Sequence, residues 1–259
     1  AIRWMRKKHL PIIGWGLGAP KNDGFETLLR NEFLKNLDAV IAYSKTGAEL
    51  YIEDGIKPTK VFVAPNAVEA KPIQPAPFRP MEFLSGKANV LYVGRIQQRK
   101  RLDVLLEACA MLPKELQPNL TLVGDGPDRA RVEEISKTVF PTAQFVGAKF
   151  GLELSAYFNR ADLFVLPGTG GLAVQQAMAH ALPVIVGEAD GTQAELVRPE
   201  NGWVLTSHSA QSLSQTLYTA LKEIRLLRAM GAESYRIVSD EINLETMVDG
   251  FAKAIRSVV

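Results

Sequence analysis

The sequence predicts an α/β protein in which parallel strands are joined by helices. Short apolar runs alternate with longer amphipathic segments along most of the 259 residues, which is typical of strand–helix–strand units. The residues within each run are almost all apolar, as expected for strands that helices cover on both faces. A proline-rich stretch interrupts the alternation once. We therefore expect two domains, each containing a doubly wound parallel sheet.

Residues 1–70, which precede the prolines, contain three strand patterns separated by helical ones. The strands are expected at Leu10–Trp15, Ala39–Tyr43 and Val61–Ala64, and the helices at Phe25–Leu37 and Lys45–Asp54. Ser44 is well placed to cap the second helix. Three strands are fewer than the five or six of a typical sheet. We expect this segment to be the C-terminal part of a domain whose remainder lies outside the chain.

Residues 71–87 are expected to connect the two domains. The segment carries four prolines, at Pro72, Pro75, Pro77 and Pro80. Proline fixes its own backbone, lacks an N–H donor and restricts the preceding residue, so neither a regular helix nor a central strand fits here. Such a segment is extended and semi-rigid. We interpret it as an interdomain linker.

Residues 88–240 restore the alternation and contain enough strands for a complete doubly wound domain. The expected strands are Val90–Val93, Leu120–Val123, Gln144–Val146, Leu163–Leu166, Val184–Val186 and Trp203–Leu205. Helical patterns fill the gaps and continue after the last strand, at Ala210–Ile224 and Leu226–Val238. Residues 241–259 form a C-terminal helix, with Met247, Phe251 and Ile255 spaced to pack on a core.

The composition indicates neither a membrane-spanning nor a nucleic-acid-binding protein. The chain is 47% hydrophobic and 22% charged, as in ordinary soluble proteins, and no apolar run approaches the roughly 20 residues of a membrane span. A net charge of +2 and a pI near 8.6 are too mild to predict nucleic-acid binding. The basic cluster of Arg3, Arg6, Lys7 and Lys8 is interpreted as a solvated helix face. Peripheral contact with an anionic membrane is the alternative.

Cys109 is the one cysteine of the sequence. It lies in an apolar helical pattern and is expected to be in the core. A chain without a disulfide partner is compatible with a reducing compartment. We therefore expect a cytoplasmic location, with the inner face of a membrane as the alternative.

In open parallel sheets, ligands bind beyond the carboxyl ends of the strands, so functional residues are expected in the loop after each strand. The loop after Val90–Val93 reads GRIQQRK and contains Gly94, Arg95, Arg99 and Lys100. Glycine lets the backbone turn, and the three cationic side chains suit phosphate oxygens. A solvated basic loop would have the same composition and is the alternative.

The loop after Leu163–Leu166 is rich in glycine, with Gly168, Gly170 and Gly171 around Thr169. A helix is expected to begin near Gly171. Backbone that approaches a ligand closely and unpaired helix N–H groups together favour a diphosphate. A tight strand-to-helix connection without a ligand is the alternative.

Two further loops carry weaker signals. Asp125, in the GDGP sequence after Leu120–Val123, is mainly a turn residue that could also contact a ribose or sugar hydroxyl. Gly147 and Ala148, after the next strand, could present a backbone amide and carbonyl to a base edge. The histidines, His9, His180 and His208, show no metal-ligand spacing, and GTGG lacks the serine of a nucleophile elbow.

Taken together and in order, these motifs resemble the C-terminal domain of glycosyltransferase family 4, also called the group 1 glycosyltransferases. The motifs that carry the resemblance are GRxxxxK, VGDGP, FVG, ADLFVLPG, AMAHALPVIV, GTQAELV and NGWVL. Before the linker, LDAVIAYSKTGAELY and KVFVAPNAVE look like the end of the family's N-terminal domain. The resemblance covers about residues 37–205.

The resemblance implies a GT-B fold, in which two Rossmann-like domains face a cleft. The C-terminal domain would bind a nucleoside diphosphate sugar, and the N-terminal one a saccharide, lipid-linked or small-molecule acceptor. It also implies hexosyl transfer with retention and without a metal or other cofactor. Arg95 and Lys100 would bind the diphosphate and stabilise the leaving group, since charge develops there in the transition state. The remaining donor contacts are expected at Gly94, Arg99, Asp125, Gly147, Ala148, Thr169, Gly170, Gly171, Leu172 and Gln176.

The chain departs from the family at a pair of glutamates that are separated by seven intervening residues and correspond to Gly168 and Gln176. Glutamine can still hydrogen-bond a ribose diol, whereas Gly168 offers no side chain. Glu188 or Asp190 could supply a carboxylate nearby. Glu195 matches a family glutamate and could equally be a structural cap or loop anchor. The departure keeps open a non-catalytic, nucleotide-binding relative. A nucleotide-sugar epimerase or phosphorylase of the same architecture is a further alternative.

Overall fold

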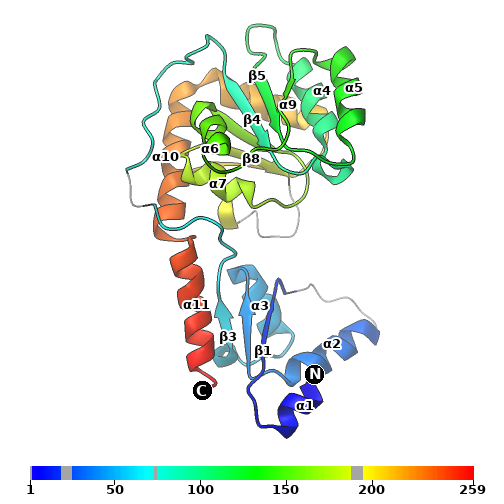
Figure 1. The fold of residues 1–259 in the computed structure, drawn as a ribbon, viewed down its shortest axis with the longest axis vertical. Coiled ribbons are helices and arrows are strands. Elements are labelled where there is room, and N and C mark those ends of the chain that lie inside the picture. Colours follow the sequence, from blue (N-terminus) through cyan, green and yellow to red (C-terminus); the bar gives the residue numbers. More distant parts are fainter. Residues whose placement is uncertain (1, 19–24, 73–74, 188–194) are drawn as a thin grey trace. The chain divides into compact units, whose positions relative to one another are not determined.

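The computed structural model describes residues 2–18, 25–72, 75–187 and 195–259. It divides into two compact units, shown in Figure 1. The first unit comprises Ala1–Lys71 together with Glu241–Val259, and the second comprises Pro72–Asp240. The C-terminal segment therefore belongs to the same unit as the N-terminal one, and each unit is described by itself.

The first unit is built on three parallel strands in the order β1-β2-β3. The strands are β1 (Ile13–Gly16), β2 (Ala39–Ala42) and β3 (Val61–Val63). Its helices are α1 (Ile2–Lys7), α2 (Phe25–Lys35), α3 (Lys45–Glu53), the short 3-10 turn η1 (Pro58–Lys60) and α11 (Leu244–Arg256). All three predicted strands are present. β2 is fully buried, whereas β1 and β3 are only partly buried.

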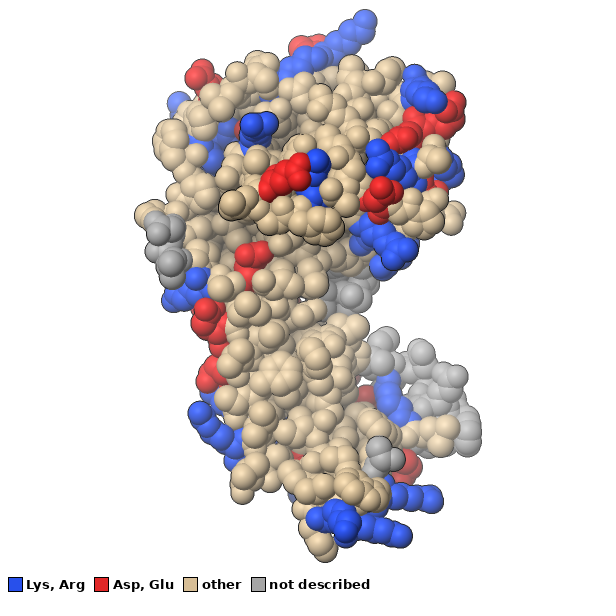
Figure 2. Space-filling view, in the orientation of Figure 1, with Lys and Arg blue, Asp and Glu red and all other residues tan. Residues whose placement is uncertain are grey.

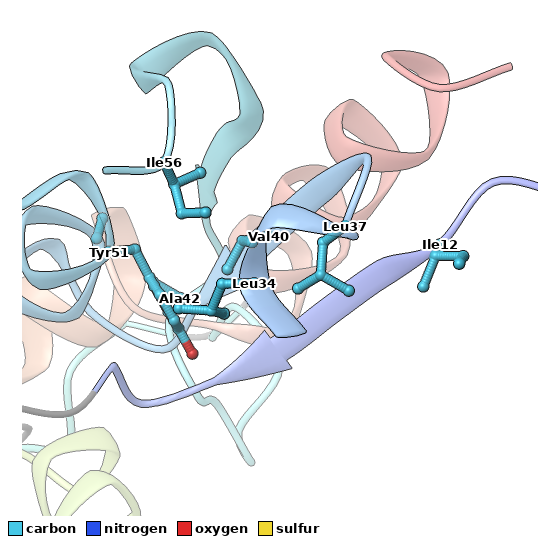
Figure 3. Packing of buried hydrophobic residues seen from close by; sticks show 8 residues of the cluster. Ile12, Leu34, Leu37, Val40, Ala42, Tyr51 and Ile56 are labelled. Atoms are coloured by element: carbon cyan, nitrogen blue, oxygen red, sulfur yellow. The ribbon is translucent and has the colours of Figure 1, made fainter. Parts of the chain in front are cut away.

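One face of this sheet packs against α2 and α3. Figure 3 shows Leu34 and Leu37 from the α2 region and Tyr51 from α3 meeting Val40 and Ala42 of β2. The start of α3 is fixed as expected, since the Ser44 hydroxyl accepts a hydrogen bond from the Gly47 amide at 2.9 Å. This bond satisfies one of the free donors at the helix N-terminus.

The last helix, α11, packs on β3 and β2 of the first unit. The approach is close at Gly250, where an added Cβ would overlap the carbonyl oxygen of Val63. Met247 and Phe251 pack as expected against a cluster that contains Ile41. The expectation for Ile255 is wrong, since it is 50% exposed. It falls at the edge of the apolar stripe because each residue advances a helix by 100°.

The second unit contains a six-stranded parallel sheet in the order β6-β5-β4-β7-β8-β9. The strands are β4 (Asn89–Val93), β5 (Asn119–Val123), β6 (Gln144–Phe145), β7 (Leu163–Leu166), β8 (Val184–Gly187) and β9 (Gly202–Leu205). The helices are η2 (Gln98–Lys100), α4 (Leu102–Ala110), α5 (Arg129–Val139), α6 (Gly151–Arg160), α7 (Ala173–Ala179), α9 (Ala210–Lys222) and α10 (Ile224–Asp240).

This strand order positions the ligand site. The chain starts at β4, runs outward through β5 and β6, and then returns to the other side of β4 with β7. The reversal creates a switch point, beyond which open α/β sheets bind ligands at the carboxyl ends of their strands. Helices cover the sheet, with α4 against α5 and α9, and α7 against α10. The structure confirms the doubly wound sheet expected from the sequence.

The core of the second unit explains why its strands could be located from sequence. All four residues of β7 and of β8 are buried, as are the central residues of β4. Cys109 is also fully buried, as expected, and burial raises the pKa of its thiol to about 12. A thiol with so high a pKa is unreactive at neutral pH.

Hydrogen bonds from Arg79 help to fix the proline-rich segment to the second unit. Arg79 donates hydrogen bonds to the carbonyl oxygens of Phe158, Ala161 and His180. Burial, together with the charge of nearby Arg228, lowers the pKa of Arg79 to about 10. Three carbonyl acceptors compensate for the buried charge, so this part of the segment is held in place.

Candidate functional site

A cleft of about 520 Å³ opens at the carboxyl ends of β4, β5 and β6. It is lined by Val93, Gly94, Arg95, Val123, Gly124, Asp125, Ala148, Lys149, Phe150, Gly151, Leu154, Ala173 and Gln176. Five of the predicted donor-site residues are therefore brought together in one cleft, namely Gly94, Arg95, Asp125, Ala148 and Gln176. The cleft has the size of a small-molecule site.

The loop after β4 is fixed by the backbone of the neighbouring strand exit. The Gly94 amide donates to the Val123 carbonyl at 3.0 Å, and the Ile96 amide to the Asp125 carbonyl at 2.9 Å. The Tyr92 hydroxyl donates to the Arg95 carbonyl at 3.1 Å. These bonds hold the backbone of Arg95 at the cleft, while its side chain is exposed.

The Lys100 side chain points to the glycine-rich loop after β7. Its side chain is buried, and its Nζ donates hydrogen bonds to the carbonyl oxygens of Thr169, at 2.6 Å, and of Gly170. Burial lowers the pKa of Lys100 to about 8, and the nearby charge of Arg99 acts in the same direction. In this structure, Lys100 therefore binds the glycine-rich loop after β7.

The glycine-rich loop packs directly on the loop after β4. The Thr169 amide donates to the Arg99 carbonyl at 3.1 Å, and the Arg99 guanidinium lies 3.4 Å from the Thr169 hydroxyl. An added Cβ at Gly168 would overlap the Arg99 carbonyl oxygen. Only glycine fits this approach. The five residues Arg99, Lys100, Thr169, Gly170 and Gly171 thus form a second group, which we call the loop contact.

The helix after this loop begins slightly later than expected. Gly170 and Gly171 have positive φ values of 57° and 157°, outside the helical range. The first helical residue is therefore Ala173, with Leu172 as the N-cap and without a side-chain capping bond. Leu172 is half-exposed and does not line the cleft, whereas Ala173 and Gln176 do.

Asp125 is partly committed to its own turn. Its carboxylate accepts a hydrogen bond from the Gly126 amide at 2.7 Å and pairs with Arg129 at 3.2 Å. Both contacts favour the local turn role that the GDGP sequence predicts. The Asp125 side chain is 61% exposed and lines the cleft, so a ligand can still reach its carboxylate.

The loop after β6 presents backbone and apolar side chains to the cleft. The Gly147 carbonyl accepts a hydrogen bond from the Gly124 amide at 2.8 Å, so it is engaged within the protein. Gly147 itself does not line the cleft, whereas Ala148 does. The sequence analysis missed Phe150 and Leu154 here, because an apolar residue at a helix start predicts core packing.

The carboxylate candidates separate into two groups. Glu188 and Asp190 lie outside the described residues. Glu195 is described, and its backbone carbonyl accepts a hydrogen bond from Arg198 at 3.3 Å. Among the described residues, no three His, Cys, Asp or Glu side chains gather as metal ligands.

His180 has a structural setting. It ends α7, stacks on Phe158 with ring centroids 5.1 Å apart, and lies 2.8 Å from the Asn159 side chain. Burial lowers its pKa, and the charge of Arg79 contributes. This histidine therefore packs against Phe158 of α6 and does not line the cleft.

Charge on the visible face is mixed in the second unit, while Lys and Arg gather around α1 in the first (Figure 2). The cluster of Arg3, Arg6, Lys7 and Lys8 is exposed. Arg6 is paired with Asp38 at 3.0 Å. None of the described helices combines the length and apolar character that crossing a bilayer requires.

Comparison with solved structures identifies the fold. Anabaena Alr3699/HepE, solved in complex with UDP, superposes with a TM-score of 0.78 over 99% of this chain and 75% of that chain, at 18% identity. Sucrose-phosphate synthase from Thermosynechococcus elongatus gives a TM-score of 0.73 over 99% of this chain and 70% of that chain, at 23% identity. Both are glycosyltransferases of the GT-B type, which confirms the expected fold.

Sequence comparison gives the same class of protein. A GDP-mannose-dependent alpha-mannosyltransferase of Mycobacterium tuberculosis is 37% identical over 123 residues, which are 46% of this chain and 30% of the relative. The sulfoquinovosyl transferase SQD2 of Arabidopsis thaliana is 37% identical over 108 residues, 40% of this chain and 20% of the relative. The matched part spans less than a third of either relative.

The family model described as "Glycosyl transferases group 1" matches residues 77–236. This range includes the three strand exits and α7, which line the cleft, as well as the loop contact and the whole six-stranded sheet. More than half of the chain is matched. The chain therefore belongs to the group 1 glycosyltransferases.

Proposed function

We propose that the protein transfers a hexosyl group from a nucleoside diphosphate sugar to an acceptor, with retention and without a metal. The observation that carries the proposal is the cleft at the switch point, with the exposed Arg95 side chain in its lining and the loop contact beside it. Family membership supports transfer of a sugar. The relatives named for GDP-mannose and the structures solved with UDP support a nucleotide-linked donor.

In the proposed reaction, the bond between the anomeric carbon and the diphosphate oxygen breaks. A bond forms between that carbon and an acceptor oxygen, whose proton is released, and the nucleoside diphosphate departs. Negative charge grows on the leaving diphosphate. Fixed positive groups stabilise such charge more in the transition state than in the ground state. We assign this role to Arg95 and Lys100.

Lys100 can reach this role only by exchanging partners. Its ammonium now binds two carbonyl oxygens of the glycine-rich loop. A diphosphate is a stronger acceptor than a neutral carbonyl, because both partners of the hydrogen bond are then charged. We therefore propose that the donor diphosphate takes over part of this coordination, next to Gly170 and Gly171.

Binding calorimetry tests the donor site. UDP, GDP, ADP and dTDP, with their glucose conjugates, are titrated into the protein. Selective binding of one diphosphate, strengthened by its sugar, would support the transferase and name the donor base. Arg95→Ala should weaken binding of the diphosphate much more than that of the bare nucleoside. Equal losses would show that Arg95 does not meet the phosphates.

A second candidate is a non-catalytic, nucleotide-binding relative. The observation in its favour is Gly168, at which the close approach to Arg99 leaves no room for any side chain. A site that lacks one charged group commonly loses several kcal/mol of transition-state stabilisation. Turnover separates the two candidates: release of diphosphate above the blank favours the enzyme, and tight binding without release favours the binding module.

We propose that the acceptor of the hexose is a saccharide, a lipid-linked sugar or a small molecule, and that the protein acts in the cytoplasm. Trp4 lies on α1 next to residues of the exposed basic cluster and is 60% exposed. Tryptophan among basic side chains suits a membrane interface. Sedimentation with anionic vesicles, compared between the protein and an Arg3→Ala/Lys7→Ala variant, tests this contact.

A further inference from the structure

Phe150 is 79% exposed although it lines the cleft. A phenylalanine ring gains free energy when it leaves water, and an exposed ring in a concave site is therefore a candidate ligand contact. Among the described residues that line the cleft, the other large apolar side chain is Leu154, which is half-buried. Phe150 consequently offers the largest free apolar surface there.

The backbone around Phe150 is well fixed. The residue has an extended conformation, with φ −140° and ψ 159°, immediately before α6. Its carbonyl accepts a hydrogen bond from the Leu154 amide at 3.3 Å. The neighbouring Lys149 pairs with Glu153 one helical turn further on. The ring is thus carried by an ordered loop, while its own faces remain open to a ligand.

Apolar and polar side chains both line the cleft. The exits of β5 and β6 contribute the apolar Val123, Ala148 and Phe150 together with the charged Asp125 and Lys149. The β4 exit and α7 add the polar side chains of Arg95 and Gln176. A nucleoside diphosphate offers a partner to both kinds of side chain, since it joins a flat base to a polyanion.

We propose that Phe150 is the stacking platform for the nucleobase of the donor. This inference rests on the proposed function and adds a residue that determines donor affinity. An aromatic ring stacks on the π face of any base, so the contact strengthens binding without selecting one base by hydrogen bonds. A purine presents a larger face than a pyrimidine. Phe150 therefore contributes more to GDP and ADP binding than to UDP binding.

Leu152 provides a matched control. It lies two residues away and is 91% exposed, yet it does not line the cleft. A macromolecule that covered this loop would bury Phe150 and Leu152 together, whereas a nucleotide in the cleft would touch Phe150 alone. The two residues thus separate a ligand contact from a protein contact.

Calorimetric titration of the full chain with GDP, UDP and inorganic pyrophosphate tests the proposal. Phe150→Ala should weaken GDP binding by about 10-fold, within the range for one base–aromatic contact, and UDP binding by less. Pyrophosphate binding should not change. Phe150→Trp should restore GDP binding, and Leu152→Ala should leave all three affinities unchanged. Thermal melts of each variant check folding.

The outcomes distinguish the two proposals. If the protein binds GDP or UDP and Phe150→Ala binds them equally well, stacking is overturned and the proposed function stands. A loss of equal size for pyrophosphate would also overturn stacking, because the base would not be the group that Phe150 contacts. If the protein binds pyrophosphate but neither nucleotide, both proposals fail.

Discussion

Two carbonyl oxygens, those of Thr169 and Gly170, hold the ammonium group of Lys100 in a buried position. Burial and Arg99 lower the pKa of Lys100 to about 8, compared with an ordinary value of 10.5. At pH 7 the side chain is therefore still largely protonated, and at pH 9 it is largely neutral. A diphosphate that binds this group requires the protonated form.

We predict that diphosphate affinity falls as the pH rises through about 8. The pKa of Lys100 is lower in the folded protein than in the unfolded chain, so the folded protein loses this positive charge at a lower pH. Phosphate oxygens are already ionised above pH 7 and do not add to the change. Titrations with UDP between pH 7 and 9.5 measure the effect.

Lys100→Arg is the matched variant, because arginine keeps its charge over this range. It should flatten the pH dependence even if its affinity at pH 7 is lower. The fall should also be absent for the bare nucleoside. An unchanged slope in Lys100→Arg would assign the titration to another group.

Gln176 supplies a second prediction at the residue scale. It lines the cleft from α7 and is the expected partner of the ribose diol. Gln176→Ala should weaken UDP binding by roughly 1 kcal/mol, the size of one neutral hydrogen bond, and 2′-deoxy-UDP binding by less. Gln176→Glu should increase the preference for ribose, since a charged acceptor binds a diol more strongly. A constant ratio between the two nucleotides in all variants would remove Gln176 from the ribose site.

At the scale of elements, the loop contact depends on the absence of a side chain at Gly168. An added Cβ there would overlap the Arg99 carbonyl oxygen and lie 2.6 Å from Lys100 Cα. These atoms belong to the backbone, so they cannot turn away as a side chain would. The loops after β4 and β7 would have to separate instead.

Gly168→Ala should therefore destabilise the protein by about 1–3 kcal/mol, as expected for overpacking. It should also weaken diphosphate binding, because the loops that bring Lys100 to Thr169 move apart. Gly170→Ala is the control. Gly170 has a φ of 57° but open space around it, so alanine costs about 1 kcal/mol of backbone strain there. Denaturant unfolding measures both variants, and a larger cost at Gly170 would contradict the packing argument.

The elements themselves could be predicted closely from sequence where burial is complete. The limits of β7 agree with the prediction, and those of β8 differ by one residue, because each is an unbroken apolar run between loops. Helix starts are less well determined by the sequence. α7 begins later than expected because Gly170 and Gly171 adopt positive φ. Glycine permits this backbone conformation but does not require it.

The site was predictable in its location but less so in its contacts. Parallel strands place Arg95 and Asp125 at the same end of the sheet, and Gln176 lies on the helix that follows β7. The order of the strands comes from the structure, because the alternation of elements does not determine it. The contact between Lys100 and Thr169 joins two segments 69 residues apart, and no local pattern encodes it. Phe150 was missed for a similar reason, because its exposure depends on how α6 begins.

At the scale of the whole molecule, the chain ends in the unit where it began. The last helix, α11, packs on β2 and β3, so residues near 250 cover a sheet formed by residues 13–63. The stability of the first unit therefore depends on contacts between distant parts of the sequence. A chain with two such units is not expected to unfold in one step.

Gly250 tests this dependence, because an added Cβ there would overlap the Val63 carbonyl. Gly250→Leu should separate α11 from β3 and destabilise the first unit by about 1–3 kcal/mol, an overpacking cost that exceeds the gain of roughly 1 kcal/mol in helix propensity. Hydrogen–deuterium exchange should accelerate in residues 39–63 and 244–256 and stay unchanged in 89–240. Val248→Leu, at a position that is 60% exposed on the same helix, should change neither region. Faster exchange confined to 89–240 would show that α11 stabilises the other unit instead.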